Sequence, residues 1–293
     1  MKKEMKTCAS YAYWKFTDKD RKFIVGLRRS KNPNINIAQI HNSYDKKEFF
    51  YDDVTEPIDS FACDAYKTYK GLLADFDICQ PKVRNKMIVG LNFGGSKDSP
   101  ICPPLHNFHN SKNDMYLAIG VIETGFEGAF LTDIIKETPT ATAKEAKEIW
   151  EKMSAGEKKK HQELFLKEIR DVVWGNSGTW EYLTIVALGG DANDILKEVL
   201  EMPDTQEALN KYKLVPVLCK LFHYSIPQKP PAKDGFSERD KNYIMLNQFA
   251  ELEAFLTKHK LLGIASEENA KELNLVAVKR WEPGSNAVEF KIH

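Results

Sequence analysis

The sequence lacks the features that mark membrane, secreted and metal-binding proteins. No stretch approaches the roughly 18 consecutive apolar residues of a membrane helix, and the start, MKKEMKTCASYAYWKF, has no apolar run like that of a signal peptide. The five cysteines are an odd number without a CxxC pair, so we expect reduced thiols rather than disulfides, zinc or an iron–sulfur cluster. The sequence therefore predicts a cytoplasmic protein with no metal and no membrane partner.

An excess of charge of either sign is absent as well. Lys plus Arg equals Asp plus Glu at 42 each, so no global field steers the protein toward nucleic acid, and DNA binding would need a local patch. The glycines of GLNFGG fit neither a GxGxxG dinucleotide loop nor a phosphate loop ending in GK[ST], and no GxSxG nucleophile elbow occurs. These motifs give no sign of an organic cofactor.

The sequence does contain short apolar runs that alternate with amphipathic segments from Lys86 onward. The runs are KMIVGLNF, GAFLTDII, YLTIVALGG and LVPVLCKLFHYS. Runs of this length separated by helices are typical of parallel strands covered on both faces. We predict an α/β fold with three α/β/α layers around a central four-stranded parallel sheet.

Helix-start signals precede the amphipathic segments. Thr142 with Glu145 and Ser154 with Glu157 fit the capping-box pattern. Ser237 is placed to cap a last long helix. The sequence also offers two caps for a helix after Gly190, namely Asp191 or Asn193.

Three regions follow from this pattern. Residues 86–260 form the predicted core, and residues 1–85 form an aromatic-rich N-terminal extension. Residues 261–293 form a C-terminal tail with a hairpin around Pro283 and Gly284. A chain of 293 residues with 42% hydrophobic content suits one domain with appendages better than two equal domains.

Polar residues end the four predicted strands. In an open parallel sheet the ligand site forms at the carboxyl ends of the strands, so these residues should converge. They are Asn92, Asp133, the pair Gly189-Gly190, and the segment from His223 to Ser225. Each has a structural explanation when taken alone, as a turn residue, a loop hydrogen bond or a partly buried histidine. Their joint placement favours a functional site.

Four motifs within residues 86–255 occur in an order that carries a resemblance. They are a strand ending in GLNxG, a Thr-Asp pair followed by Lys and a Pro- and Thr-containing turn, an IVALG strand, and a strand ending in His-x-Ser. Together they resemble the uracil-DNA glycosylase superfamily, most closely its mismatch-specific, thymine-DNA glycosylase branch. The resemblance implies a monofunctional DNA glycosylase that binds single- or double-stranded DNA and needs no metal or organic cofactor.

The resemblance also implies roles for individual residues. The family flips a base out of the DNA and cleaves its N-glycosidic bond with water. Asn92 matches the asparagine that positions this water, and His223 matches a histidine that stabilises the leaving base in some members. An amide suffices because the base leaves as an anion from an oxocarbenium-like sugar, so the site needs an oriented water more than a strong base.

Base and DNA contacts are implied in the same way. Phe108 stands five residues before Asn113, the spacing that places an aromatic ring against the flipped base, although a loop aromatic packed on the core explains it equally well. Phe93 is a second candidate base contact. The candidate DNA contacts are Gly94, Gly95, Ser96, Tyr224 and Ser225, with Tyr224 in place of the family's usual proline.

The main departure from the family is Asp133, where the family usually has an asparagine that reads the flipped base. Asparagine suits uracil or thymine, since it donates to O4 and accepts from N3–H, whereas a carboxylate cannot donate. Cytosine offers an amino donor and an N3 acceptor, which a protonated aspartic acid matches, and burial favours that neutral form. We therefore hypothesise a cytosine-like base. Removing ordinary cytosine would destroy the host's own DNA, so a modified cytosine in foreign DNA, such as phage DNA, fits a defence role.

Two other questions stay open at this level. The aromatic and basic residues between Tyr11 and Arg29 either stack on bases and neutralise phosphates or, as we favour, pack an extension onto the core. The alternatives to a glycosylase are a non-catalytic nucleotide- or DNA-binding protein of the same fold and an unrelated small-molecule hydrolase, since fold alone does not fix function.

Overall fold

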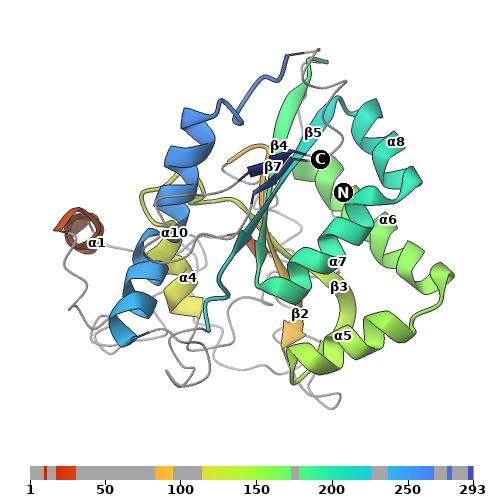
Figure 1. Ribbon diagram of the computed structural model, residues 1–293, viewed down its shortest axis with the longest axis horizontal. Coiled ribbons are helices and arrows are strands. Elements are labelled where there is room, and N and C mark those ends of the chain that lie inside the picture. Colours follow the sequence, from red (N-terminus) through yellow and green to blue (C-terminus); the bar gives the residue numbers. More distant parts are fainter. Residues whose placement is uncertain are drawn as a thin grey trace, which may run out of the picture.

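A seven-stranded sheet between two helical layers forms the body of the protein (Figure 1). The computed structural model describes residues 10–11, 18–30, 83–94, 114–172, 178–225, 237–266, 276–278 and 290–292. The strands are β1 Ser10–Tyr11, β2 Lys86–Gly94, β3 Phe130–Thr140, β4 Glu181–Leu188, β5 Leu214–Leu221, β6 Val276–Val278 and β7 Phe290–Ile292. The helices are α1 Asp18–Ser30, α4 Asp114–Val121, α5 Ala143–Lys152, α6 Ala155–Val172, α7 Gly190–Glu201, α8 Pro203–Lys211 and α10 Glu238–Lys258.

The four predicted strands are the centre of this sheet and are all parallel. Their order is β3-β2-β4-β5, with β2 paired to β3 on one side and to β4 on the other. All eight residues of β4 are buried, as expected for a parallel strand with both faces covered. The predicted α/β fold with a four-stranded parallel centre is therefore confirmed.

Two hydrophobic clusters fill the layers on either side of the sheet. One joins Ile88, Val186 and Val217 to residues of α1, α4 and α10, and the other joins Val89, Ile185 and Leu218 to residues of α5, α6, α7 and α8. The same division is visible in Figure 1, where α4 and α10 lie on one side of the sheet and α5 to α8 on the other.

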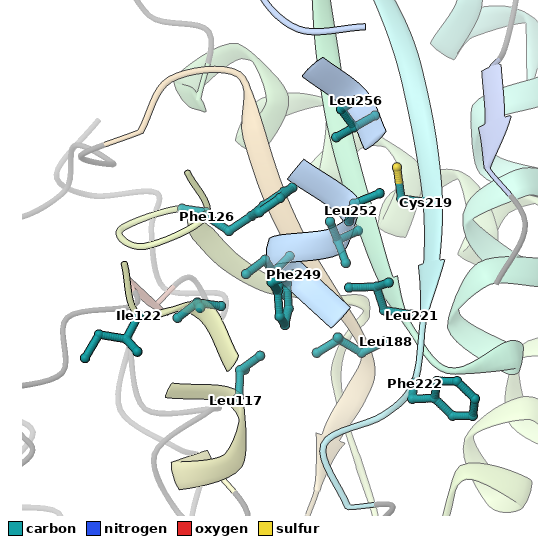
Figure 2. Packing of buried hydrophobic residues seen from close by; sticks show 14 of the residues in the cluster. Leu117, Ile122, Phe126, Leu188, Cys219, Leu221, Phe222, Phe249, Leu252 and Leu256 are labelled. Atoms are coloured by element: carbon teal, nitrogen blue, oxygen red, sulfur yellow. The ribbon is translucent and has the colours of Figure 1, made fainter. Parts of the chain in front are cut away.

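Figure 2 shows the first cluster from close by, with Phe249, Leu252 and Leu256 of α10 packed between the sheet and the α4 region. Helices α4 and α10 approach closely because Gly120 has no side chain. A Cβ there would lie 3.0 Å from the carbonyl oxygen of Met245. Within the described part of the chain, no helix is long and apolar enough to span a membrane.

Helix caps agree with the sequence at three positions and differ at one. Thr142, Ser154 and Ser237 accept hydrogen bonds from the backbone three residues later, as predicted. The prediction that Asp191 or Asn193 caps the next helix is wrong, because α7 begins at Gly190 directly after the N-cap residue Gly189. Gly189 has a φ of 98°, which glycine adopts without strain, so the chain turns from β4 into the helix before either side chain is reached.

The chain segments on either side of the core lengthen the same sheet. β1 pairs antiparallel with β3, and β6 pairs parallel with β5. β6 and β7 pair antiparallel, as the predicted C-terminal hairpin requires, while Pro283 and Gly284 at its expected turn lie outside the described residues. The extension and the tail therefore contribute strands to the core sheet.

Helix α1 is held on the core by two arginines. Arg21 forms ion pairs with Glu123 at 2.9 Å and with Glu127 at 2.6 Å. Arg28 donates to four carbonyl oxygens, those of Ile119, Gly120, Ile122 and Leu246. Three of these belong to the C-terminal end of α4 and the turn after it, where helix carbonyls lack partners within the helix. These contacts favour the packing role for this part of the N-terminal region; residues 12–17 lie outside the described part.

We predict that Arg28→Met lowers the free energy of unfolding by about 3 kcal/mol, since several charge-assisted hydrogen bonds are lost and carbonyl groups are left unsatisfied. Urea unfolding followed by circular dichroism measures this. The matched control is Lys22→Met on the same helix, because Lys22 is exposed and its replacement should change stability by no more than about 0.5 kcal/mol. Equal stability of the two variants would contradict the clamp role of Arg28.

Candidate functional site

The topology places a candidate ligand site at the carboxyl ends of β2 and β4. The chain passes from β2 to β3 on one side and then returns to β4 on the other side of β2. In doubly wound sheets, ligands bind outside the carboxyl ends of the strands at such a switch point. Asn92 belongs to the end of β2, and Gly189 follows the end of β4. Two of the four predicted positions therefore lie at the switch point itself.

The strand registers show which strand ends lie at the same edge of the sheet. The β2–β4 pairing ends at Val89 and Ala187, and the β4–β5 pairing ends at Leu188 and Leu221. The chain after β4 still lies beside β5, because the N–H of Gly189 donates to the carbonyl oxygen of Leu221 at 2.9 Å. Asn92 and His223 therefore both lie at the carboxyl edge of the parallel sheet, on β2 and just after β5.

Two glycines follow β4 at this edge. A Cβ added to Gly189 would lie 3.7 Å from the Cβ of His223, and one added to Gly190 would lie 3.6 Å from Nζ of Lys220. The backbone after β4 therefore runs close to His223 and Lys220 with no side chain of its own at these two positions.

Asn92 is half-buried, and its side-chain nitrogen is held by the end of β3. Nδ2 donates to Oγ1 of Thr140 at 2.7 Å and to the carbonyl oxygen of Thr138 at 3.3 Å. Thr140 in turn donates to the carbonyl oxygen of Thr142 at 3.1 Å. The role of Thr140 was not predicted, because the two residues come together only through the pairing of β2 with β3.

The His-x-Ser segment forms a closed unit after β5. The backbone N–H of Ser225 donates to Nδ1 of His223 at 3.1 Å, and the Ser225 hydroxyl lies 2.8 Å from the same nitrogen. Since Nδ1 accepts, the proton of the neutral ring is on Nε2. The ring stacks on Tyr224 with centroids 4.2 Å apart, and the N–H of Phe222 donates to Gln248 of α10 at 3.0 Å. Stacking and this anchor support the segment from His223 to Ser225.

Asp133 is buried, with 3% of its surface exposed, and it does not end its strand. β3 continues to Thr140, so the predicted end at this residue is wrong. Asp133 pairs with Gly90 of β2 and alternates along the strand with Thr132, which faces α6. It therefore lies on the face covered by α4 and α10, two residues farther from the carboxyl edge of the sheet than Asn92.

A buried charge cluster lies behind Asp133, on the α6 side of β3. The ammonium group of Lys136 is fully buried, 2.6 Å from Glu168 and 2.5 Å from the hydroxyl of Thr132, which donates to Glu168. Burial raises the pKa of Glu168 to about 7, although the charge of Lys136 opposes this, and the charge of Asp133 adds to it. A lysine within an apolar strand run was the sequence signal for this cluster.

Lys220 is a further residue that the sequence did not single out. Its ammonium group approaches Gly190 at the start of α7, where no side chain caps the first backbone N–H groups. A helix N-terminus with a nearby cation favours an anion such as a phosphate group. Asp191 in the first turn is paired with Lys147 at 3.2 Å, which offsets its negative charge.

Several predicted site residues cannot be placed. Gly95, Ser96 and Phe108 lie outside the described residues, and Phe93 and Gly94 are described only as part of the β2 backbone. In the described part of the chain, no group of three or more His, Cys, Asp or Glu side chains is positioned to hold a metal ion. Cys219, the one cysteine within this part, is a buried free thiol whose pKa is raised by burial.

These features define an α/β protein with a polar site at the switch point of its parallel sheet. Comparisons with protein-family models, with curated proteins and with solved structures give no match. The likeness to uracil-DNA glycosylases therefore rests on the four sequence motifs.

The cluster at Lys136 predicts a pH dependence of stability. The pKa of Glu168 in the folded protein lies above its ordinary value of 4.5, so the folded state binds the proton more tightly than the unfolded state. The stabilisation is fully present below about pH 4.5 and is lost as the pH rises through about 7. Urea midpoints measured between these values should fall with pH in the wild type and less steeply in Glu168→Gln. The exposed Glu163 on the same helix gives the control, and an equal slope in Glu163→Gln and Glu168→Gln would contradict the assignment.

Proposed function

We propose that the protein is a DNA glycosylase that flips a base from DNA and hydrolyses its N-glycosidic bond. The observation that supports the proposal is that Asn92 at the end of β2, the two glycines after β4 and His223 after β5 all lie at the carboxyl edge of the parallel sheet, beside its switch point. The family resemblance assigns catalytic roles to these same two residues.

Asn92 and His223 would divide the chemistry between them. Nδ2 of Asn92 donates to β3, so the amide oxygen would accept a hydrogen bond from the attacking water, whose lost proton passes to solvent. The water oxygen bonds to the sugar C1′ as the bond from C1′ to the base breaks, and the electron pair leaves with the base. The neutral ring of His223 would donate its Nε2 proton as a hydrogen bond to that anionic base.

DNA binding would use the neighbouring groups at the same edge. Lys220 and the uncapped first turn of α7 supply positive potential for a phosphate group. Ser225 extends this surface on the other side of His223. Such a local patch is what a chain with a net charge of zero needs in order to bind DNA.

Asp133 would select the base. It lies beside Gly90 of β2 and is buried, with 3% of its surface exposed. A neutral acid at this position can accept from an amino group and donate to a ring nitrogen, the pattern of cytosine. We therefore propose a modified cytosine as the substrate base, in foreign DNA against which the protein defends.

The deciding experiment incubates the protein with single- and double-stranded oligonucleotides that carry uracil, thymine mismatches or modified cytosines, and then detects alkali-labile abasic sites. We expect cleavage by the wild type and a loss of at least about 100-fold in Asn92→Ala, because the water is no longer oriented. Tight binding without abasic sites would support a non-catalytic DNA-binding protein instead. The absence of both DNA binding and cleavage would point to an unrelated hydrolase.

The identity of the base is tested by Asp133→Asn. The amide restores the donor and acceptor pattern that suits uracil, so the ratio of kcat/KM for uracil over the cytosine derivative should rise by about 10⁴-fold or more. The comparison uses the same oligonucleotide with either base. An unchanged ratio would show that Asp133 does not contact the base, while activity in both proteins would leave the glycosylase assignment intact.

A further inference from the structure

We propose that Thr140 is a positioning residue that fixes the side-chain amide of Asn92 in the orientation needed to hold a water molecule. The proposal rests on the catalytic role proposed for Asn92. Thr140 is the last residue of β3 and is 95% buried, so its hydroxyl acts on Asn92 and not on a ligand.

The hydrogen bonds around Thr140 have only one possible direction. The carbonyl oxygen of Thr142 can only accept, so the Thr140 hydroxyl donates its single proton to it, at 3.1 Å. The lone pairs of the same hydroxyl accept from Nδ2 of Asn92 at 2.7 Å. Thr142 is itself fixed as the N-cap of α5, where its carbonyl also accepts from the backbone N–H of Ala146. The start of α5 therefore determines which group donates and which accepts in the hydrogen bonds that link Thr142, Thr140 and Asn92.

The second proton of the amide confirms this orientation. Nδ2 also donates to the carbonyl oxygen of Thr138 at 3.3 Å. A flipped amide would place the Asn92 oxygen against that carbonyl, and two acceptors would face each other. Since Nδ2 donates to both Thr140 and Thr138, the side-chain amide is held in one orientation.

An irregularity in the β2–β3 ladder brings these groups to Asn92. The paired positions advance from Asn92 to Gly94 on β2 but from Ile135 to Thr140 on β3. β3 therefore contains three more residues than its partner over this interval. The extra residues carry Thr138 and Thr140 around the Asn92 side chain. Such bulges commonly re-aim a side chain beside an active site.

The kinetic test compares Thr140→Val, which removes the hydroxyl and keeps the shape, with Thr140→Ser, which keeps the hydroxyl. We expect Thr140→Val to lower kcat by about 10- to 100-fold with less than about a threefold change in KM, because the water is misplaced while DNA binding persists. Thr140→Ser should stay within about threefold of the wild type. Thr184→Val is the matched control, because Thr184 is buried in β4 and its hydroxyl has no hydrogen-bond partner among the residues that the structure describes.

A second measurement does not depend on activity. Nuclear magnetic resonance identifies the two side-chain amide protons of Asn92 as the pair that disappears in Asn92→Ala. Their exchange with solvent should be slow in the wild type and Thr184→Val and at least about tenfold faster in Thr140→Val. Should Thr140→Val fail to fold, Thr140→Ala replaces it in both measurements.

The outcomes separate the two proposals. Absence of glycosylase activity in the wild type, with the amide exchange as expected, would overturn the proposed function and retain the positioning of Asn92. An active wild type in which Thr140→Val keeps both its kcat and the slow exchange would overturn the role of Thr140. Loss of kcat in Thr140→Val with full rescue in Thr140→Ser supports both.

Discussion

The parallel pairing of β2 with β3 on one side and β4 on the other is the constraint on which the rest of the structure depends. The register of these two strand pairs determines which residues of β2, β3 and β4 lie side by side, because each strand is hydrogen-bonded to its neighbour along its length. A slip of one residue in β2 would turn Asn92 to the opposite face and bury Leu91 in the wrong layer. The alternation of Ile88 and Val89 between the two hydrophobic clusters fixes the register against such a slip.

The sequence was sufficient for the layers and the central strands of the fold. Apolar runs predicted all four central strands, and local patterns predicted the caps Thr142, Ser154 and Ser237, since both kinds of signal depend on neighbours in sequence. The start of α7 was missed because a positive φ at Gly189 decided it. The true end of β3 was missed because Asp133 is polar but buried, and polarity alone suggested a strand end.

The remaining features of the site required contacts between distant residues. Nothing in the sequence joins Thr140 to Asn92, which are 48 positions apart, or Lys136 to Glu168, which are 32 apart. The second pair explains how β3 tolerates a lysine among apolar residues, since a buried charge is stable only with a partner and hydrogen bonds. In both cases the irregular end of β3 decides which groups meet, and such irregularities leave no periodic signal.

The outer edge of β3 is protected in an unusual way. Within the described residues, β1 covers this edge only at Phe130 and Leu131. Farther along, the outward backbone N–H of Lys136 is taken up by Nδ1 of His161, at 3.0 Å. Burial lowers the pKa of His161, which favours the neutral ring that accepts this hydrogen bond. An edge strand with unpaired backbone N–H and C=O groups can pair with a strand of another molecule, which leads to aggregation. Here the imidazole ring of His161 blocks such pairing at Lys136.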